Sequence, residues 1–335
     1  MFELLIGNFG KRNSVQNGQS QKAIQILRLL NEHMHVHPKQ IDSGDYLAYA
    51  ISFVQAIRQG QSIALCVGPK GIRLASMLFR LLEPTLRRKP AITLFVVGGW
   101  LPDLAGRARD VAELCRVSRV LVEAQGLRDE LAANDISSEL FPNFRMLPVL
   151  KRSRPYDANQ IRLVYCGRIS TAKGAERALE MLNALRKQKS RAQLDFFGPM
   201  EEPALVDLID WTEGASYRGS FDDVSATAQI FPEYDFLVLP SAYPGECVPG
   251  AVVEAMFAGL PSVVSNWRFL PEIVQDRVTG IVCNLNDFTE TASTRIAKIT
   301  GAEHGRMSAR CSNEANERYS SAYACERLLG SKRHV

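Results

Sequence analysis

The sequence lacks the cysteine patterns of a disulfide-stabilised or zinc-binding protein. Its seven cysteines are scattered, odd in number and never form a Cys-x-x-Cys pair, a usage typical of reduced thiols in the cytosol. No apolar run approaches the roughly 18–20 residues of a membrane helix, and the start of the chain has neither the basic region nor the apolar core of a signal peptide. We therefore expect a cytoplasmic protein, soluble or peripheral to a membrane.

A strong charge of one sign is also missing. The net charge is +4 over 335 residues, with the basic excess in the N-terminal half, so charge alone does not indicate a nucleic-acid-binding protein. The Gly-x4-Gly-Lys-Ser/Thr order of a Walker loop is absent as well. A chain of this length exceeds one ordinary hydrophobic core, which predicts two domains.

Short apolar segments alternate with longer amphipathic ones along the chain. The expected strands are residues 2–6, 62–67, 92–97, 119–122, 162–166, 193–197, 236–239 and 262–264. Several are apolar throughout, which suits parallel strands covered on both faces. Helices are indicated between them by stripes such as Ala178, Met181, Leu182 and Leu185. This alternation predicts an α/β fold with parallel sheets.

Residues 147–159 form the expected domain boundary. They contain Pro, Arg and Lys, have little apolar periodicity, and separate two complete α/β runs. We therefore predict an N-terminal domain at residues 1–150, a C-terminal domain at 151–312 and a helical tail at 313–335.

The segment Gly167-Arg168-Ile-Ser-Thr-Ala-Lys173-Gly174 follows an expected strand and precedes an expected helix. Helix N-termini bind anions through free N–H groups and the helix dipole. The planar guanidinium of Arg168 and the ammonium of Lys173 at such a place predict a clamp for a phosphate or pyrophosphate. The alternative is a loop with two solvated cations.

Two glutamates follow the expected strand at 236–239. Glu246 lies in a Pro/Gly-rich turn and Glu254 lies on the next helix, for which Pro249 suits the first position. Ligands of open α/β sheets bind beyond the carboxyl ends of the strands, where a carboxylate can accept two hydrogen bonds from a vicinal diol. The alternative is that both glutamates only favour a helix N-terminus.

Together these motifs resemble the donor half of family 4 nucleotide-sugar glycosyltransferases. The resemblance is carried by Gly-Arg-x4-Lys-Gly at 167–174, Pro-Ser-x4-Glu-x7-Glu-Ala-Met-x2-Gly-x-Pro at 240–261 and Leu-Pro-Glu-Ile-Val-Gln-Asp-x-Val-Thr-Gly at 270–280. Residues 98–102, 122–127 and 141–144 are similar, more loosely, to a bacterial subgroup that builds surface polysaccharides. The resemblance implies a GT-B fold, in which an N-terminal acceptor domain and a C-terminal donor domain, both Rossmann-like, face each other across a cleft.

The resemblance also implies roles for single residues. Arg168 and Lys173 would hold the donor diphosphate, Glu254 the ribose hydroxyls, and Glu246 would lie against the transferred sugar, so Glu246, Arg168 and Lys173 are the expected catalytic residues. The remaining expected donor contacts in this half are Cys247, Val248, Pro249, Gly250, Gly198 and Phe221. The chain departs from the family at 247–249, where glycine-rich residues often stand, and Pro249 removes one possible N–H donor.

Two turns of the N-terminal half complete the expected site. The resemblance implies that the loop after the first strand brings Gly18 and Gln19 near the donor phosphates; the alternative is a turn rich in Gly and Asn. On the acceptor side, Gly99 would allow close backbone approach and Trp100 would offer a flat face to a sugar. The alternative for this pair is a helix cap and a core aromatic residue.

Two further polar clusters lie in the N-terminal half. Arg87, Arg88 and Lys89 follow several leucines, a composition that suits an anionic membrane surface; the alternative is a solvated helix end. Residues 33–37 contain three histidines at the end of an early helix, which we interpret as a solvated polar segment rather than a metal or catalytic site.

We therefore expect a hexosyltransferase that moves a sugar from a UDP- or GDP-sugar to a lipid-linked glycan in surface polysaccharide synthesis. The resemblance implies retention at the anomeric carbon, no cofactor and no metal. The expected partners are the donor, the acceptor and an anionic surface at the inner face of the plasma membrane, with no nucleic acid. The alternatives are a sugar-nucleotide epimerase of the same fold and a non-catalytic nucleotide-sugar-binding subunit.

Overall fold

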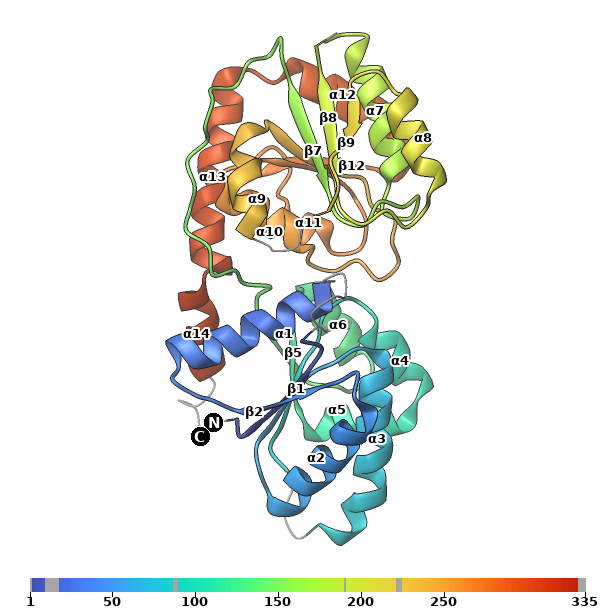
Figure 1. Ribbon diagram of the computed structural model, residues 1–335, viewed down its shortest axis with the longest axis vertical. Coiled ribbons are helices and arrows are strands. Elements are labelled where there is room, and N and C mark those ends of the chain that lie inside the picture. The colour runs from blue at the N-terminus through green and yellow to red at the C-terminus, as the bar shows by residue number, and fades with distance from the viewer. Residues whose placement is uncertain (1, 10–17, 87–89, 190, 221–224, 331–335) are drawn as a thin grey trace. The chain divides into compact units, whose positions relative to one another are not determined.

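A computed structural model describes residues 2–9, 18–86, 90–189, 191–220 and 225–330. The chain forms two compact units, one of Met1–Phe144 with Ser321–Val335 and the other of Arg145–Ser320 (Figure 1). No helix in the described segments has both the length and the apolar character needed to span a membrane.

The first unit is built on a parallel six-stranded sheet with the order β2-β1-β3-β4-β5-β6. Its strands are β1 (Leu4–Gly7), β2 (Lys39–Asp42), β3 (Ile63–Cys66), β4 (Ile92–Phe95), β5 (Arg119–Val122) and β6 (Ser138–Leu140). Its helices are α1 (Gly18–Arg28), α2 (Tyr46–Gln59), α3 (Pro69–Leu82), α4 (Leu101–Arg107), α5 (Arg109–Val117), α6 (Gln125–Ala132) and α14 (Ser321–Gly330). Helix α3 packs against both α2 and α5. Strands β1, β3 and β4 are buried throughout, as expected of the central strands of a sheet covered on both faces.

The second unit repeats this architecture with the strand order β12-β11-β10-β7-β8-β9, again all parallel. Its strands are β7 (Arg162–Cys166), β8 (Gln193–Phe197), β9 (Ala215–Tyr217), β10 (Phe236–Leu239), β11 (Ser262–Ser265) and β12 (Gly280–Cys283). Its helices are α7 (Ala175–Arg186), α8 (Ala204–Trp211), α9 (Ser225–Ile230), α10 (Gly250–Phe257), α11 (Leu270–Ile273), α12 (Phe288–Lys298) and α13 (Gly301–Tyr319). Helix α7 packs with α8 and α12, and α10 packs with α9 and α13 (Figure 1). The predicted α/β class with parallel sheets is confirmed, and each unit is Rossmann-like.

The C-terminal residues differ from the predicted tail at 313–335. Helix α13 continues through residue 313 to Tyr319, and α14 belongs to the first unit. There Arg119 donates a hydrogen bond to the carbonyl oxygen of Leu328 at 3.2 Å, and Arg327 donates one to that of Leu140 at 3.2 Å. At the other boundary, the second unit begins at Arg145 rather than at residue 151.

Helix α13 carries a buried histidine, His304. The Nε2 atom of His304 lies 2.8 Å from the carbonyl oxygen of Asp235, and its ring stacks on Tyr156 with the centroids 4.5 Å apart. Burial lowers the pKa of His304 to about 4. The folded protein therefore keeps this ring neutral at a pH where the unfolded chain would protonate it.

We expect the stability of the second unit to fall as the pH drops from about 6.5 toward 4. The unfolded histidine has a pKa near 6.5, so below that pH the unfolded state binds the extra proton, and the loss should reach about 2–3 kcal/mol by about pH 4.5. Urea unfolding at several pH values measures this slope. His304→Gln should flatten it, whereas His33→Gln, at an exposed position, should not; an unchanged slope in His304→Gln would show that another group is responsible.

Candidate functional site

The predicted clamp loop lies against two neighbouring strand ends in the second unit. Gly174 has a φ of 84°, and a Cβ there would lie 2.1 Å from the carbonyl oxygen of Pro240, directly after β10. Gly198, directly after β8, has a φ of 135°, and its Cβ would lie 1.9 Å from the carbonyl oxygen of Gly167. Glycine is needed at both positions, because only a residue without a side chain permits these backbone approaches. The turns after β7, β8 and β10 are therefore packed together.

Lys173 and Glu246 meet between two of these turns. The Nζ atom of Lys173 lies 2.9 and 2.8 Å from the two carboxylate oxygens of Glu246. Their side chains are only 15% and 5% exposed. A pair so shielded from water is expensive to break on one side, because the remaining charge would stay buried without compensation.

Arg168 is held by a carboxylate that the sequence did not indicate. Its Nη1 atom lies 3.0 Å from Oε1 of Glu201, and both side chains are about two-fifths exposed. Burial disfavours the charged guanidinium, but its hydrogen bond and charge interaction with Glu201 outweigh this and raise the pKa of Arg168. The guanidinium stays charged at any physiological pH.

Tyr243 brings the two predicted cations together. The centre of its ring lies 4.8 Å from the guanidinium carbon of Arg168 and 4.9 Å from Nζ of Lys173. The indole N–H of Trp267 donates a hydrogen bond to the backbone carbonyl of Tyr243 at 2.8 Å, which fixes the turn that carries the ring. Aromatic faces attract cations, so one ring organises both members of the predicted clamp.

The second glutamate is paired as well. Glu254 lies on α10, and its Oε1 accepts a hydrogen bond from Nε of Arg145 at 2.8 Å. Helix α10 begins at Gly250, one residue later than predicted, with Pro249 as the extended residue before it. The N–H groups of Val252 and Val253 bond to the carbonyl oxygen of Pro249, whereas those of Gly250 and Ala251 stand at the helix start and can serve a ligand.

The other expected donor contacts are distributed around these pairs. Cys247 and Val248 are buried in the turn before α10, while Pro249 and Gly250 are partly exposed. Phe221 lies outside the described residues. The structure thus brings Arg168, Lys173, Glu246, Gly198 and Tyr243 into one group of adjoining turns, and α10 continues from it.

The remaining predicted contacts belong to the first unit and lie in two places. Gly18 and Gln19 begin α1, and the side chain of Gln19 lies within 2.9 Å of the position that a Cβ on Gly68 would take. Gly99 is buried, and Trp100 is the residue before α4. The indole N–H of Trp100 donates a hydrogen bond to the carbonyl oxygen of Val97 at 2.7 Å, so its polar edge is engaged within the turn.

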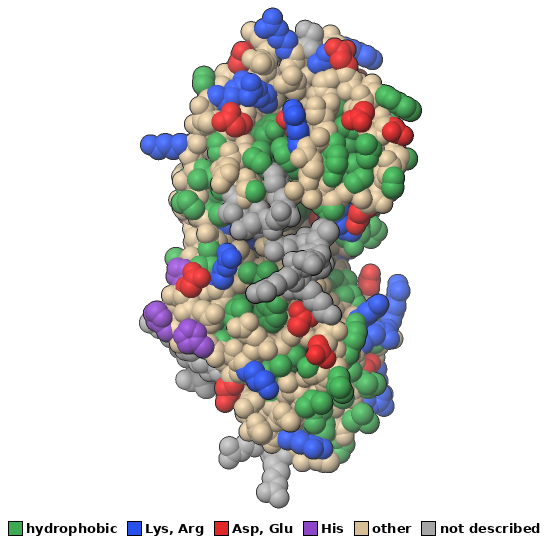
Figure 2. Space-filling view, viewed as in Figure 1, with side chains coloured by type: hydrophobic (Ala, Val, Ile, Leu, Met, Phe, Trp, Pro, Cys, Tyr) green, Lys and Arg blue, Asp and Glu red, His purple; other side chains and the backbone are tan. Residues whose placement is uncertain are grey.

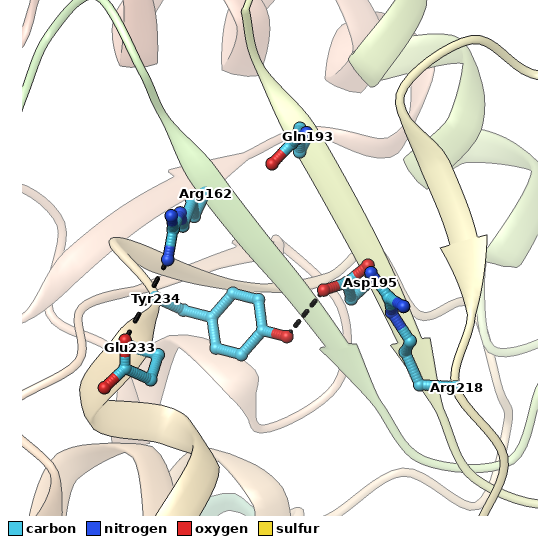
Figure 3. A pocket seen from close by; sticks show the side chains of 6 residues that line it. All are labelled: Arg162, Gln193, Asp195, Arg218, Glu233 and Tyr234. Atoms are coloured by element: carbon cyan, nitrogen blue, oxygen red, sulfur yellow. Dashed lines mark hydrogen bonds and ion pairs between the residues drawn. The ribbon is translucent and has the colours of Figure 1, made fainter.

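The second unit also has a polar pocket of about 430 Å³ (Figure 3). It is lined by Arg162, Gln193, Asp195, Arg218, Glu233 and Tyr234. Most of these residues come from the amino ends of β7 and β8 or precede β10, whereas the clamp residues follow the carboxyl ends. Its charges pair internally, with Arg218 Nε 3.0 Å from Asp195 and Tyr234 donating to Asp195 at 2.7 Å. In the described parts of the chain, no group of His, Cys, Asp and Glu residues could hold a metal ion.

Three residues that contact the predicted site residues were not predicted from the sequence. Tyr243 stands inside the 240–261 motif and could have been found there. Arg145 directly follows the loosely matching segment 141–144, and Glu201 follows the turn at Gly198. Nothing in the sequence indicates that Arg145 pairs with Glu254 or that Glu201 pairs with Arg168.

Comparison with known proteins finds a family that resembles part of this chain. Residues 160–300 match the model of the glycosyl transferases group 1. A sulfoquinovosyl transferase of Arabidopsis thaliana is 27% identical over 55% of this chain and 36% of its own length. A GDP-mannose-dependent phosphatidylinositol dimannoside mannosyltransferase of Mycobacterium tuberculosis is 33% identical over 34% of this chain and 30% of its own. The matches thus cover about a third of these relatives.

Solved structures extend the likeness over both units. Anabaena HepE in complex with UDP-glucose has a TM-score of 0.75 at 14% identity, with 99% of each chain covered. The lipopolysaccharide outer core galactosyltransferase WaaB has a TM-score of 0.69 at 13% identity, with 99% of this chain and 100% of the other covered. Residues 160–300 are therefore similar to the group 1 glycosyltransferases, and the chain as a whole has the GT-B fold.

Proposed function

We propose that this chain is a glycosyltransferase that moves a sugar from a nucleoside diphosphate sugar to a glycan acceptor. The observation that carries the proposal is the convergence of Arg168 and Lys173 on the ring of Tyr243, at turns that follow the carboxyl ends of parallel strands. Two cations at such turns suit a diphosphate. The transferase names of the relatives and the UDP-glucose bound by HepE support this assignment.

Each clamp residue has a proposed partner on the donor. The diphosphate oxygens would replace Glu201 as the partner of Arg168 and would share Lys173 with Glu246. Glu254 would accept hydrogen bonds from the ribose hydroxyls, Glu246 would lie against the transferred sugar, and the base would lie near Gly198. The two cations and the first N–H groups of α10 would stabilise the charge that develops on the departing diphosphate.

We further propose that the reaction proceeds with retention at the anomeric carbon and without a metal ion. Fixed cations and helix N–H groups take the place of a Lewis acid when they are aimed at the leaving group. The leaving diphosphate itself would then receive the acceptor proton, so no side chain is assigned as the base. Transfer that persists in EDTA and gives the same anomer as the donor would support this account; metal dependence or inversion would contradict it.

A ligand screen separates the proposal from its alternatives. UDP, GDP and ADP, each alone and with a sugar attached, are tested for thermal stabilisation of the protein; a ligand at about a hundred times its Kd adds about 2.7 kcal/mol. The stabilising sugar nucleotide is then incubated with and without glycan acceptors. Acceptor-dependent release of the nucleotide supports a transferase. Conversion of the sugar without an acceptor indicates an epimerase, and binding without turnover indicates a non-catalytic subunit.

We further propose a lipid-linked acceptor in surface polysaccharide synthesis. One relative is named for action on a phosphatidylinositol dimannoside, another is a protein of the cps region of Klebsiella pneumoniae, and WaaB is named for the lipopolysaccharide outer core. Transfer to short lipid-linked oligosaccharides, compared with the same free oligosaccharides, tests this directly. Equal transfer rates to the lipid-linked and the free oligosaccharides would contradict a requirement for a lipid-linked acceptor.

A lipid acceptor requires access to a membrane, and the first unit has a surface that suits one. Exposed apolar residues of α2 and α3 are Tyr46, Leu47, Ile51, Met77 and Leu81. Exposed cations stand among them on α3, at Lys70, Arg73 and Arg80, and hydrophobic and basic side chains gather on this part of the first unit (Figure 2). Apolar contact combined with cations favours anionic lipid surfaces. The predicted patch Arg87, Arg88 and Lys89 lies outside the described residues.

We expect Leu81→Ser combined with Arg80→Ser to lower binding to phosphatidylglycerol vesicles several-fold, because it removes apolar area and a charge worth about 1 kcal/mol. Co-sedimentation with vesicles at low and high salt measures the effect. Leu208→Ser, on the exposed face of α8, is the matched control. Equal sedimentation of both variants and the wild type would exclude this face from membrane binding.

A further inference from the structure

We propose that Arg145 is a positioning residue of the donor site, which holds the carboxylate of Glu254 so that the site distinguishes ribose from deoxyribose. The inference rests on the proposed function, because it assigns the nucleotide ribose to Glu254. Arg145 itself lies outside residues 160–300, which match the family model.

The contact is a shielded, charge-assisted hydrogen bond. Nε of Arg145 lies 2.8 Å from Oε1 of Glu254, and the two side chains are 4% and 7% exposed. Residues 109 positions apart in the chain are joined by this bond. A carboxylate has about four acceptor sites on its two oxygens, so a bond at Oε1 leaves acceptor capacity for the hydroxyls of a ligand and also fixes the direction in which that capacity points.

Both partners are anchored by regular structure. The backbone N–H of Arg145 donates to the carbonyl oxygen of Tyr319 at 2.8 Å, and the backbones of Arg145 and Ser320 form an isolated parallel β-bridge. Glu254 is fixed from the other side by α10, which packs on α13. The side chains therefore meet from two rigid supports, a condition for positioning a ligand group to within a fraction of an ångström.

The first residue of α10 shows where the guanidinium lies. A Cβ on Gly250 would come within 2.1 Å of Nη2 of Arg145 and 3.3 Å of Oε1 of Glu254. The guanidinium thus lies beside the first residue of α10, near the helix N-terminus, where the helix dipole disfavours a cation. Glu254 offsets this cost, and the position is the same helix end at which the proposed donor binds.

A purely structural ion pair would behave differently. Buried pairs are often matched in stability by apolar residues of similar size, and losing such a pair would weaken every ligand of the site to the same degree. A positioning role predicts a selective effect, confined to ligands that carry the ribose hydroxyl. The comparison of ribose and deoxyribose ligands is therefore the readout that a structural role would not change.

The test measures Kd by calorimetry for UDP, GDP and ADP, each beside its 2′-deoxy counterpart. In the wild type the ribonucleotide that binds should be preferred by about tenfold or more, the range expected for a hydrogen bond to a charged group. Arg145→Lys keeps the charge but loses the planar fork, and it should reduce this preference to about twofold while binding of the deoxy form stays within about twofold of wild type.

Gly250→Ala is the second variant, because it displaces the guanidinium and leaves both charges in place. It should reduce the preference in the same way, which keeps the proposal testable if Arg145→Lys does not fold. The inference is overturned if Arg145→Lys prefers the ribonucleotide over its 2′-deoxy counterpart as strongly as the wild type does. If Arg145→Lys does not fold, the same result in Gly250→Ala overturns it. Failure of the wild type to bind any of the three nucleotides would instead count against the proposed function.

Discussion

Replacing Lys173 with alanine is expected to lower kcat for sugar transfer about 100- to 1000-fold, the usual effect of removing one group that stabilises charge in a transition state. The ammonium of Lys173 lies 2.8–2.9 Å from both oxygens of Glu246 and 4.9 Å from the ring of Tyr243. Its loss removes a cation from the expected diphosphate site. It also leaves the carboxylate of Glu246, only 5% exposed, without its partner, and that negative charge then opposes the departing diphosphate.

Two variants make this result specific. Lys173→Arg keeps the charge and should lose much less activity than Lys173→Ala. Lys187→Ala removes an exposed lysine just beyond the end of α7 and should leave kcat unchanged. Steady-state rates with the sugar nucleotide found by the ligand screen provide the measurement. A decrease of less than about fivefold in folded Lys173→Ala would show that this lysine does not act on the leaving group.

The largest effect on stability is expected for Asp235→Asn, at about 3–5 kcal/mol. Asp235 is fully buried; it accepts a hydrogen bond from Nη2 of Arg152 at 2.7 Å and another from the backbone N–H of Arg162 at 2.8 Å. Nη1 of Arg154 lies 3.8 Å away. Asparagine keeps the shape but removes the charge, so two largely buried guanidinium groups lose their counter-ion.

Urea unfolding of wild type and variant measures this difference. Glu113→Gln is the matched control, because it breaks an exposed pair with Arg109 and should cost less than about 0.5 kcal/mol. Asp235 precedes β10 and the clamp follows the strand ends, so nucleotide affinity of folded Asp235→Asn should stay at the wild-type value. A loss of stability below about 1 kcal/mol would mean that water or rearrangement compensates the arginines.

The central strands of both sheets were predictable and the edge strands were not. All eight predicted segments form strands, whereas the four that were missed, β2, β6, β9 and β12, are the outer strands of the two sheets. An outer strand pairs on one side only. The residues of β2 are exposed or partly exposed, and those of β6 and β9 are partly exposed, so they lack the apolar run that marks a strand covered on both faces. The C-terminal tail was misjudged because α13 and α14 are both polar helices and no periodicity shows which unit each one joins.

The grouping of charged candidate residues was predictable where a motif placed charge beside a glycine turn. Arg168, Lys173 and Glu246 stand in such turns, and strand order brings them together. Their partners depend on contacts between segments far apart in the chain. Glu201 and Arg145 are ordinary charged residues in the sequence, and only the fold shows that one meets Arg168 and the other meets Glu254.

The most direct test of the proposed donor site is a calorimetric titration of UDP and GDP into wild type and Arg168→Ala. The guanidinium is charged and partly exposed, and its partner Glu201 is itself about two-fifths exposed, so a diphosphate should be able to replace that carboxylate. We expect the nucleotide that binds the wild type to bind Arg168→Ala at least about tenfold more weakly, and Arg191→Ala, at an exposed position outside the clamp, to bind as the wild type does. Wild-type affinity in Arg168→Ala would place the donor elsewhere and contradict the account.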